Sequence, residues 1–143
     1  MALAVNLHTK LFEAIEAKFN SDSDLTGLVG TFYRDFMPSD AASYPCVVVR
    51  HGQEGGSVDQ AVTLDGYEPA GELMLIAFEV YATTCAEASQ IGWQIAQLFN
   101  GWNGSFGHVD VLSTAREQPV WAGQDEEGVC SANVLFTVSC AAT

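Results

Sequence analysis

The feature that most constrains the fold is a strict alternation of residue types over residues 130–140. Apolar residues occupy every even position, whereas the odd positions are polar except for Leu135. Successive side chains of a β-strand point to opposite faces, so this pattern predicts a strand with one buried and one exposed face. Such a strand belongs to a sheet whose buried face is covered by other elements.

Three further segments predict strands of the same sheet. Residues 46–50 contain three successive valines, which suit a pleated surface better than a helix. Residues 73–82 are apolar at nearly every position and predict a central strand that is covered on both faces. Val109 and Val111 support another strand. The chain therefore carries four strand signals.

Two segments have the apolar periodicity of amphipathic helices. Residues 7–20 show one apolar stripe, with Asn6 as a plausible N-cap. The second helix begins at a capping box formed by Thr84 and Glu87 and is expected to end at Gly101. We predict an α+β fold in which these two main helices pack on a mostly antiparallel four-stranded sheet.

The segments between these elements are predicted to be irregular. Residues 25–37 contain glycine breakers, and residues 38–45 form a connector between prolines. Residues 53–71 and 117–128 are polar excursions, and the first predicts a long protruding loop or hairpin that is a candidate binding arm. We expect residues 1–143 to form a single domain, with the arm at 53–71.

The charge and hydropathy of the chain exclude several classes of function. Its 143 residues carry 18 acidic and 5 basic side chains, which gives a net charge of −13. The basic residues are dispersed, which disfavours specific nucleic-acid binding. No apolar run is long enough to cross a membrane. The first residues do not have the pattern of a signal peptide, so we expect the protein to stay in the compartment where it is made.

No motif predicts catalysis, a metal site or a cofactor site. Ser105 lies near His108, but the glycines around them indicate a turn between a helix and a strand. The four cysteines lack the spacing of zinc ligands, and we expect buried thiols that act as small hydrophobic residues. Whether any of them pair is left open. They are Cys46, Cys85, Cys130 and Cys140.

The three tryptophans are interpreted separately. Trp102 lies on the apolar stripe of the second helix and is expected in the core. Trp93 falls on the flank of that helix, where either a subunit contact or local packing explains it. Trp121 lies in a polar excursion and leaves the same two alternatives. The complete set of candidate interface residues is Trp93, Trp121, Val62, Leu64, Tyr67 and Arg116.

The order of these segments resembles the tail-completion or tail-terminator proteins of long-tailed bacteriophages, which join tail to head. The resemblance covers nearly the whole chain and rests on pattern and order. The residues that carry it are Leu7 to Phe19, Leu28 to Tyr33, Tyr44 to Val49, Phe78 to Thr83, Cys85 to Ala88 and Val134 to Val138. The chain departs from the family in the length and acidity of its two excursions, so which of them faces the tube or the neck is open.

The resemblance implies a structural role without enzymatic activity. Members of that family form six-membered rings that cap the tail tube. This implies self-association, a tail tube protein and a head-neck connector protein as partners, DNA passing through the ring, and no membrane. It implies assembly in the host cytoplasm and a place at the head-proximal end of the virion tail. The alternatives are another neck or tail-tube-like structural subunit, or a small ligand-binding domain.

Overall fold

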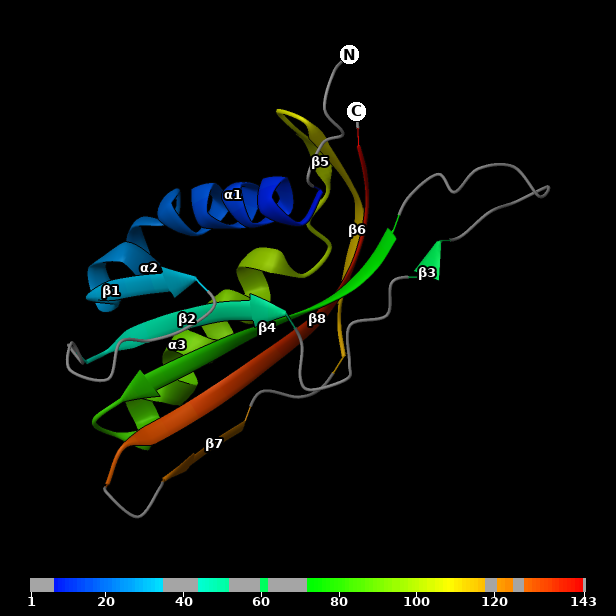
Figure 1. Ribbon diagram of the computed structural model, residues 1–143. Helices are drawn as coiled ribbons and strands as arrows, with labels where there is room; N and C mark the ends of the chain where they lie inside the picture. Colours follow the sequence, from blue (N-terminus) through cyan, green and yellow to red (C-terminus); the bar gives the residue numbers. More distant parts are fainter. Residues whose placement is uncertain are drawn as a thin grey trace.

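The computed structural model describes residues 7–34, 44–51, 60–61, 72–117, 121–124 and 128–142 (Figure 1). Within these ranges, two helices, four strands, a third helix and four further strands follow one another, which confirms the predicted α+β class. In chain order the elements are α1 (Leu7–Asn20), α2 (Ser23–Leu28), β1 (Thr31–Arg34), β2 (Cys46–His51), β3 (Gln60–Ala61), β4 (Glu72–Ala82), α3 (Cys85–Phe99), β5 (Gly104–Phe106), β6 (Val109–Arg116), β7 (Trp121–Gln124) and β8 (Cys130–Ala142).

The sheet is built around the long antiparallel pair of β4 and β8 (Figure 1). Their register runs from Glu72 opposite Cys140 to Ala82 opposite Cys130. The even-numbered residues 130–140 of β8 are at most 2% exposed, as the alternation predicts. Their buried face lies against α3 and α1, so the alternation correctly identified the side of the sheet that holds the core.

Two shorter strands share each outer edge of this pair. β2 and β3 pair with β4, whereas β6 and β7 pair with β8. β1 adds a parallel strand beside β2, and β5 adds an antiparallel strand beside β6. In the described part of the chain the sheet is therefore mixed and has eight strands, which corrects the prediction of four mostly antiparallel strands. β1, β3, β5 and β7 are two to four residues long, too short to show an alternation in the sequence.

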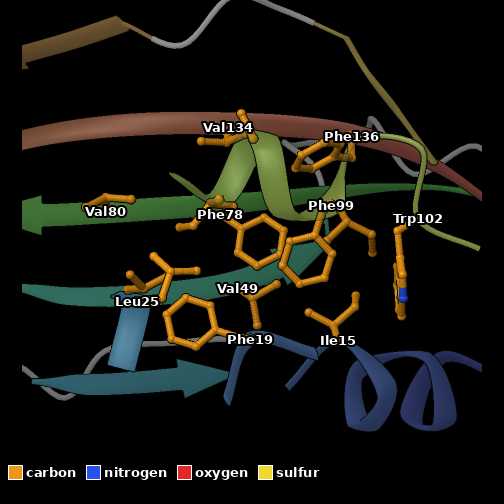
Figure 2. Packing of buried hydrophobic residues seen from close by; sticks show 14 of the residues in the cluster. Ile15, Phe19, Leu25, Val49, Phe78, Val80, Phe99, Trp102, Val134 and Phe136 are labelled. Carbon is orange, nitrogen blue, oxygen red and sulfur yellow. The ribbon is translucent and has the colours of Figure 1, made fainter. Parts of the chain in front are cut away.

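The core lies between the curled sheet and the helices α1 and α3. Phe78 of β4 lies 4.9 Å from Phe99 of α3 and 5.9 Å from Phe136 of β8, measured between ring centroids. Figure 2 shows these three rings in one layer, with Ile15 of α1 beside them. Trp102 is 6% exposed and packs edge-on against Phe99, so its predicted place in the core is confirmed. It follows the end of α3 at Phe99, however, and does not lie on the apolar stripe of that helix.

The ends of α3 follow from its sequence. Thr84 precedes the helix in an extended conformation, and its side-chain oxygen accepts a hydrogen bond of 3.2 Å from the amide of Glu87. This contact satisfies one of the amides that the first helical turn leaves unpaired. The helix ends at Phe99, and Gly101 has a φ of 76°, a left-handed conformation that glycine adopts without strain. The predicted start and stop are both confirmed.

The segment 25–37 was predicted to be irregular, and this is wrong for most of its described part. Asp22 caps the short helix α2, because its Oδ1 accepts hydrogen bonds from the amides of Asp24 and Leu25 at 2.9 and 3.0 Å. Leu25 is fully buried, and Phe32 of β1 lies 4.5 Å from Phe19 between ring centroids. A six-residue helix and a four-residue strand are too short to produce a periodic pattern.

Two predicted features are only partly described. Asn6 and most of the 53–71 arm lie outside the described residues, although β3 falls within the arm and pairs with β4. The 117–128 excursion contains β7, so it is not entirely irregular. The outer face of β4 also differs from the prediction, because Leu75 and Ala77 are half-buried instead of covered.

Candidate subunit interface

Trp93 lies on the flank of α3, outside its buried stripe. The buried stripe of this helix contains Ile91, Ile95 and Phe99, all at most 1% exposed. Trp93 is 44% exposed, a large exposed fraction for an indole ring. Local packing therefore covers only part of the ring, and the remainder is available to another surface.

Arg116, from the sheet, contacts the exposed ring of Trp93. It is the last residue of β6, opposite Phe136, on the face of the sheet that carries the helices. Its Cζ lies 5.0 Å from the centroid of the Trp93 ring. A guanidinium at this distance is attracted to the indole face, and exposed contacts of this kind contribute about 0.5–1 kcal/mol. The structure thus brings together two of the six candidate interface residues.

The backbone of Trp121 lies near the same place. Trp121 begins β7 opposite Asn133, and β7 packs against α3. Because Arg116 pairs with Phe136, the backbones of Trp121 and Arg116 lie along one edge of β8, three strand positions apart. This spacing is about 10 Å. The side chain of Trp121 is not among the described atoms, and Val62, Leu64 and Tyr67 lie outside the described residues.

The end of β6 is held by its neighbour Glu117. The Glu117 amide donates a 2.8 Å hydrogen bond to the carbonyl oxygen of Leu135, which continues the ladder by one residue. The Thr137 hydroxyl donates to Glu117 Oε1. Thr137 lies on the outer face of β8, so these contacts fix the backbone next to Arg116 from the opposite side of the sheet.

Leu112 is a second exposed large hydrophobic residue, which the sequence analysis missed. It is 53% exposed and lies where the register of β6 shifts between Val111 and Ser113. Because of this bulge Thr114, and not Ser113, returns to the buried face. The sequence signal that could have identified Leu112 is its position between Val111 and Ser113, where the alternation predicts an outward-facing residue. The bulge itself cannot be recognised from the sequence pattern.

Most described basic side chains are paired with acids. Lys10 lies 3.4 Å from Glu13, Arg34 lies 3.0 Å from Glu16, and Arg50 lies 2.9 Å from Glu79. Among the described residues Arg116 forms no ion pair, and its charge faces Trp93. The net charge of −13 makes an exposed cation rare on this surface.

A polar network on the outer face of the sheet joins Arg50, Glu79 and Tyr81. The Tyr81 hydroxyl donates a 2.8 Å hydrogen bond to Glu79 Oε2, which also contacts Arg50. Burial, reinforced by the Glu79 carboxylate, raises the pKa of Tyr81 to about 12. A phenol with such a pKa stays protonated at neutral pH and makes a poor general base. The network therefore connects β2 to β4 and does not resemble an acid–base pair.

The other sites considered from the sequence have structural explanations. The Ser105 hydroxyl donates to Asp110 across the β5–β6 hairpin, and Gly107 turns that hairpin with a φ of 64°. The predicted turn is thus part of a hairpin. Within the described ranges, no three His, Cys, Asp or Glu residues gather as metal ligands. No helix there has the length and apolarity needed to cross a membrane.

An open groove of about 390 Å³ lies between α2 and α3. Its lining contains the amides of Gln90 and Gln94, the hydroxyl of Ser23 and the carboxylate of Asp24. Gln94 also donates a 3.2 Å hydrogen bond to Asp22 Oδ2 and so links the two helices. The lining offers hydrogen-bonding groups but no aromatic ring, so the exposed Trp93 and Arg116 pair is the better-defined candidate for a subunit contact.

Comparison with known proteins finds the same fold in solved structures. No protein-family model matches the chain, and no curated protein matches it. A chain in the virion of a native gene transfer agent particle superposes with a TM-score of 0.72 at 16% identity, over 96% of this chain and 98% of that chain. The bacteriophage SPP1 gp17 protein gives a TM-score of 0.51 at 20% identity, over 92% of this chain and 88% of that chain. The chain therefore shares its fold with these two proteins, in agreement with the phage resemblance of its sequence.

Proposed function

We propose that the chain is a non-enzymatic structural protein of a phage-like virion, which caps the tail tube as a ring subunit and joins the tail to the head-neck. The observation that carries this proposal is the fold similarity to a gene transfer agent virion chain, because it extends over 96% of this chain and 98% of that one. The likeness to the SPP1 gp17 protein supports the same role. The order of sequence segments supports it independently.

The exposed pair of Trp93 and Arg116 is the proposed contact between neighbouring subunits. A ring joins identical subunits through two different patches, so each subunit needs one surface to present and another to receive. Tryptophan and arginine are the residue types that most often dominate the energy of an interface. A half-exposed indole held in place by a guanidinium gives such an anchor with little loss of side-chain freedom on binding.

The acidity of the chain fits passage of DNA through the ring without specific binding. A net charge of −13 repels phosphates and lowers the residence time of DNA on the wall of a channel. Replacing several acidic residues of the loops by lysine should then slow DNA ejection. An unchanged rate of ejection would contradict this part of the proposal.

The proposal is tested by the assembly state of the purified full-length chain. Light scattering and negative-stain microscopy should show a closed ring, and the chain added to tail tubes should bind one end and stop their growth. Trp93→Ala and Arg116→Ala should weaken the ring, whereas Lys10→Ala removes a cation that is paired with Glu13 and should not. Open-ended polymers would favour a tail-tube-like subunit, and binding to the head side alone would favour another neck protein.

A further inference from the structure

Two of the four cysteines meet where α3 begins. Cys85 is the first residue of α3, and Cys130 is the first residue of β8. Their Sγ atoms lie 2.6 Å apart, although the residues are 45 positions apart in the chain. This is shorter than a van der Waals contact of two sulfur atoms and within roughly 0.6 Å of the disulfide bond length of about 2.05 Å.

The fold places these sulfur atoms together by well-defined backbone geometry. Cys130 lies opposite Ala82, the last residue of β4, and only two residues separate Ala82 from the start of α3. Thr84 caps the helix at that point and fixes the direction in which α3 leaves the strand. Cys130 is on the buried face of β8, and Cys85 is half-buried against the same core. The fold thus brings the two sulfur atoms together at the junction of β4, α3 and β8.

The other two cysteines differ from this pair. Cys46 and Cys140 are both fully buried, and Cys46 lies on the outer face of β2, opposite Tyr81. Burial raises the pKa of the Cys46 thiol, which lowers the fraction of reactive thiolate. Cys140 lies opposite Glu72, at the other end of the β4–β8 pair from Cys130. The chain thus contains one pair poised to react and two internal controls.

We propose that Cys85 and Cys130 form an intramolecular disulfide when the protein meets a low-molecular-weight disulfide such as oxidised glutathione. The half-buried Cys85 attacks first as its thiolate, forms a mixed disulfide and releases one molecule of glutathione. The Cys130 thiolate then attacks Cys85 Sγ and displaces the second molecule. Two protein thiols are oxidised to one disulfide, and the oxidant is reduced to two thiols.

The disulfide bond links the start of α3 to the start of β8. In the unfolded chain it closes the segment between Cys85 and Cys130 into a loop. A loop of this length restricts the unfolded ensemble, so the melting temperature should rise by about 10 °C. In a reducing cytosol the thiols stay reduced, and the bond forms once the protein leaves it. That timing rests on the proposed virion role, whereas the bond itself does not.

The test uses the purified full-length chain, first reduced and then incubated with oxidised glutathione. Thiols counted after denaturation should fall from four to two, peptide mapping should find Cys85 linked to Cys130, and dithiothreitol should reverse the rise in melting temperature. Cys85→Ser should keep three thiols and show no shift. Cys140→Ala is the matched control and should form the same link.

Three results overturn the proposal: four thiols after oxidation, a glutathione that remains on Cys85, or a link between another pair. If Cys85→Ser fails to fold, the thiol count and the peptide map of the unsubstituted chain still decide. Ring formation is measured separately. A chain that links these cysteines without forming rings refutes only the proposed function, and a ring with four reactive thiols refutes only the disulfide.

Discussion

The two sides of α3 use aromatic residues differently. On the side that faces the sheet, Phe99 is 1% exposed and packs against Phe78 and Phe136. On the flank, Trp93 is 44% exposed and contacts the guanidinium of Arg116. The two aromatic residues are separated by roughly 1.7 helical turns, so they belong to one rigid element. The comparison teaches that one helix can hold the fold with one side and present a contact residue with the other.

The difference between these sides is energetic. A fully buried ring contributes through removal of apolar area from water and through close packing, so its loss leaves a cavity. A half-exposed ring contributes less to folding, because water already reaches part of its surface. Its remaining apolar area becomes favourable only when a partner covers it. Substitutions on the two sides should therefore act on different measurements.

Phe99→Ala should have the largest effect on stability. Removing a ring packed between Phe78 and Phe136 leaves a cavity in the core, and the free energy of unfolding should fall by about 3–5 kcal/mol. Urea denaturation followed by circular dichroism measures this loss. Trp93→Ala on the same helix is the control, and it should lose less than about 1 kcal/mol. If Phe99→Ala and Trp93→Ala lower the free energy of unfolding equally, the two sides of α3 do not differ in their contribution to folding.

Trp93→Ala should have the second largest effect, on association and not on folding. A central aromatic anchor contributes about 2 kcal/mol or more to an interface, so subunit affinity should fall roughly 30-fold. Analytical ultracentrifugation across a range of concentrations measures the change. Leu112→Ala is the matched comparison, because Leu112 is the other large exposed hydrophobic residue among those the structure describes. If both variants assemble like the unsubstituted chain, the flank of α3 is not the interface.

Asp22→Ala should have a moderate effect, because Asp22 connects α2 to the exposed side of α3. It caps α2 and accepts a hydrogen bond from Gln94, so its loss should lower the free energy of unfolding by about 1 kcal/mol. Ser23→Ala, at the next position, is the control. A loss from Asp22→Ala no larger than that of Ser23→Ala would show that the cap contributes little.

The contribution of Asp22 should depend on pH. Its pKa lies below the usual 3.8, first because the amide of Leu25 donates a hydrogen bond to the carboxylate, then because Gln94 and Asp24 donate as well. A carboxyl whose folded-state pKa is lowered stabilises the fold above its unfolded pKa and loses that effect as pH falls through the folded value. The difference between Asp22→Ala and the unsubstituted chain should therefore be constant above pH 5 and shrink below about pH 4. A difference that persists at pH 2 would assign the effect to another cause.

The long elements of this fold could be predicted from the sequence because each repeats its pattern several times. The alternation over residues 130–140 identified the buried face of β8, and Thr84 with Gly101 identified the bounds of α3. The strands β1, β3, β5 and β7 are too short for any periodicity and exist because longer strands offer an edge to pair with. Tertiary pairing decides such segments, and a local pattern cannot reveal it.

The candidate site was predictable in part, for the same reason. Helical spacing placed Trp93 on the flank of α3, and its exposed ring agrees with that position. The contact with Arg116 depends on the residue of β8 that lies opposite the end of β6. That register is shifted by the bulge at Leu112, which cannot be read from the alternation of residue types in the sequence. The proximity of Cys85 and Cys130 likewise depends on the register of β4 and β8. Sequence spacing indicates which face a residue occupies, whereas strand register decides which distant residue it meets.

Substitutions of Arg116 should have the smallest effect on the free energy of unfolding. They distinguish the contribution of its charge from that of its planar guanidinium stacked on Trp93. A double-mutant cycle between Trp93→Ala and Arg116→Ala should give a coupling energy of about 0.5–1 kcal/mol in the free energy of unfolding. Arg116→Lys keeps the charge but loses the planar guanidinium, so it should keep only part of this coupling. A cycle between Trp93→Ala and Lys10→Ala is the control and should give none. The expected coupling energy is far below the loss of unfolding free energy in Phe99→Ala, so the contact of Trp93 with Arg116 contributes little to holding α3 on the sheet. Arg116→Ala should therefore weaken subunit association more than it lowers the free energy of unfolding. The opposite result would show that Arg116 acts mainly in folding.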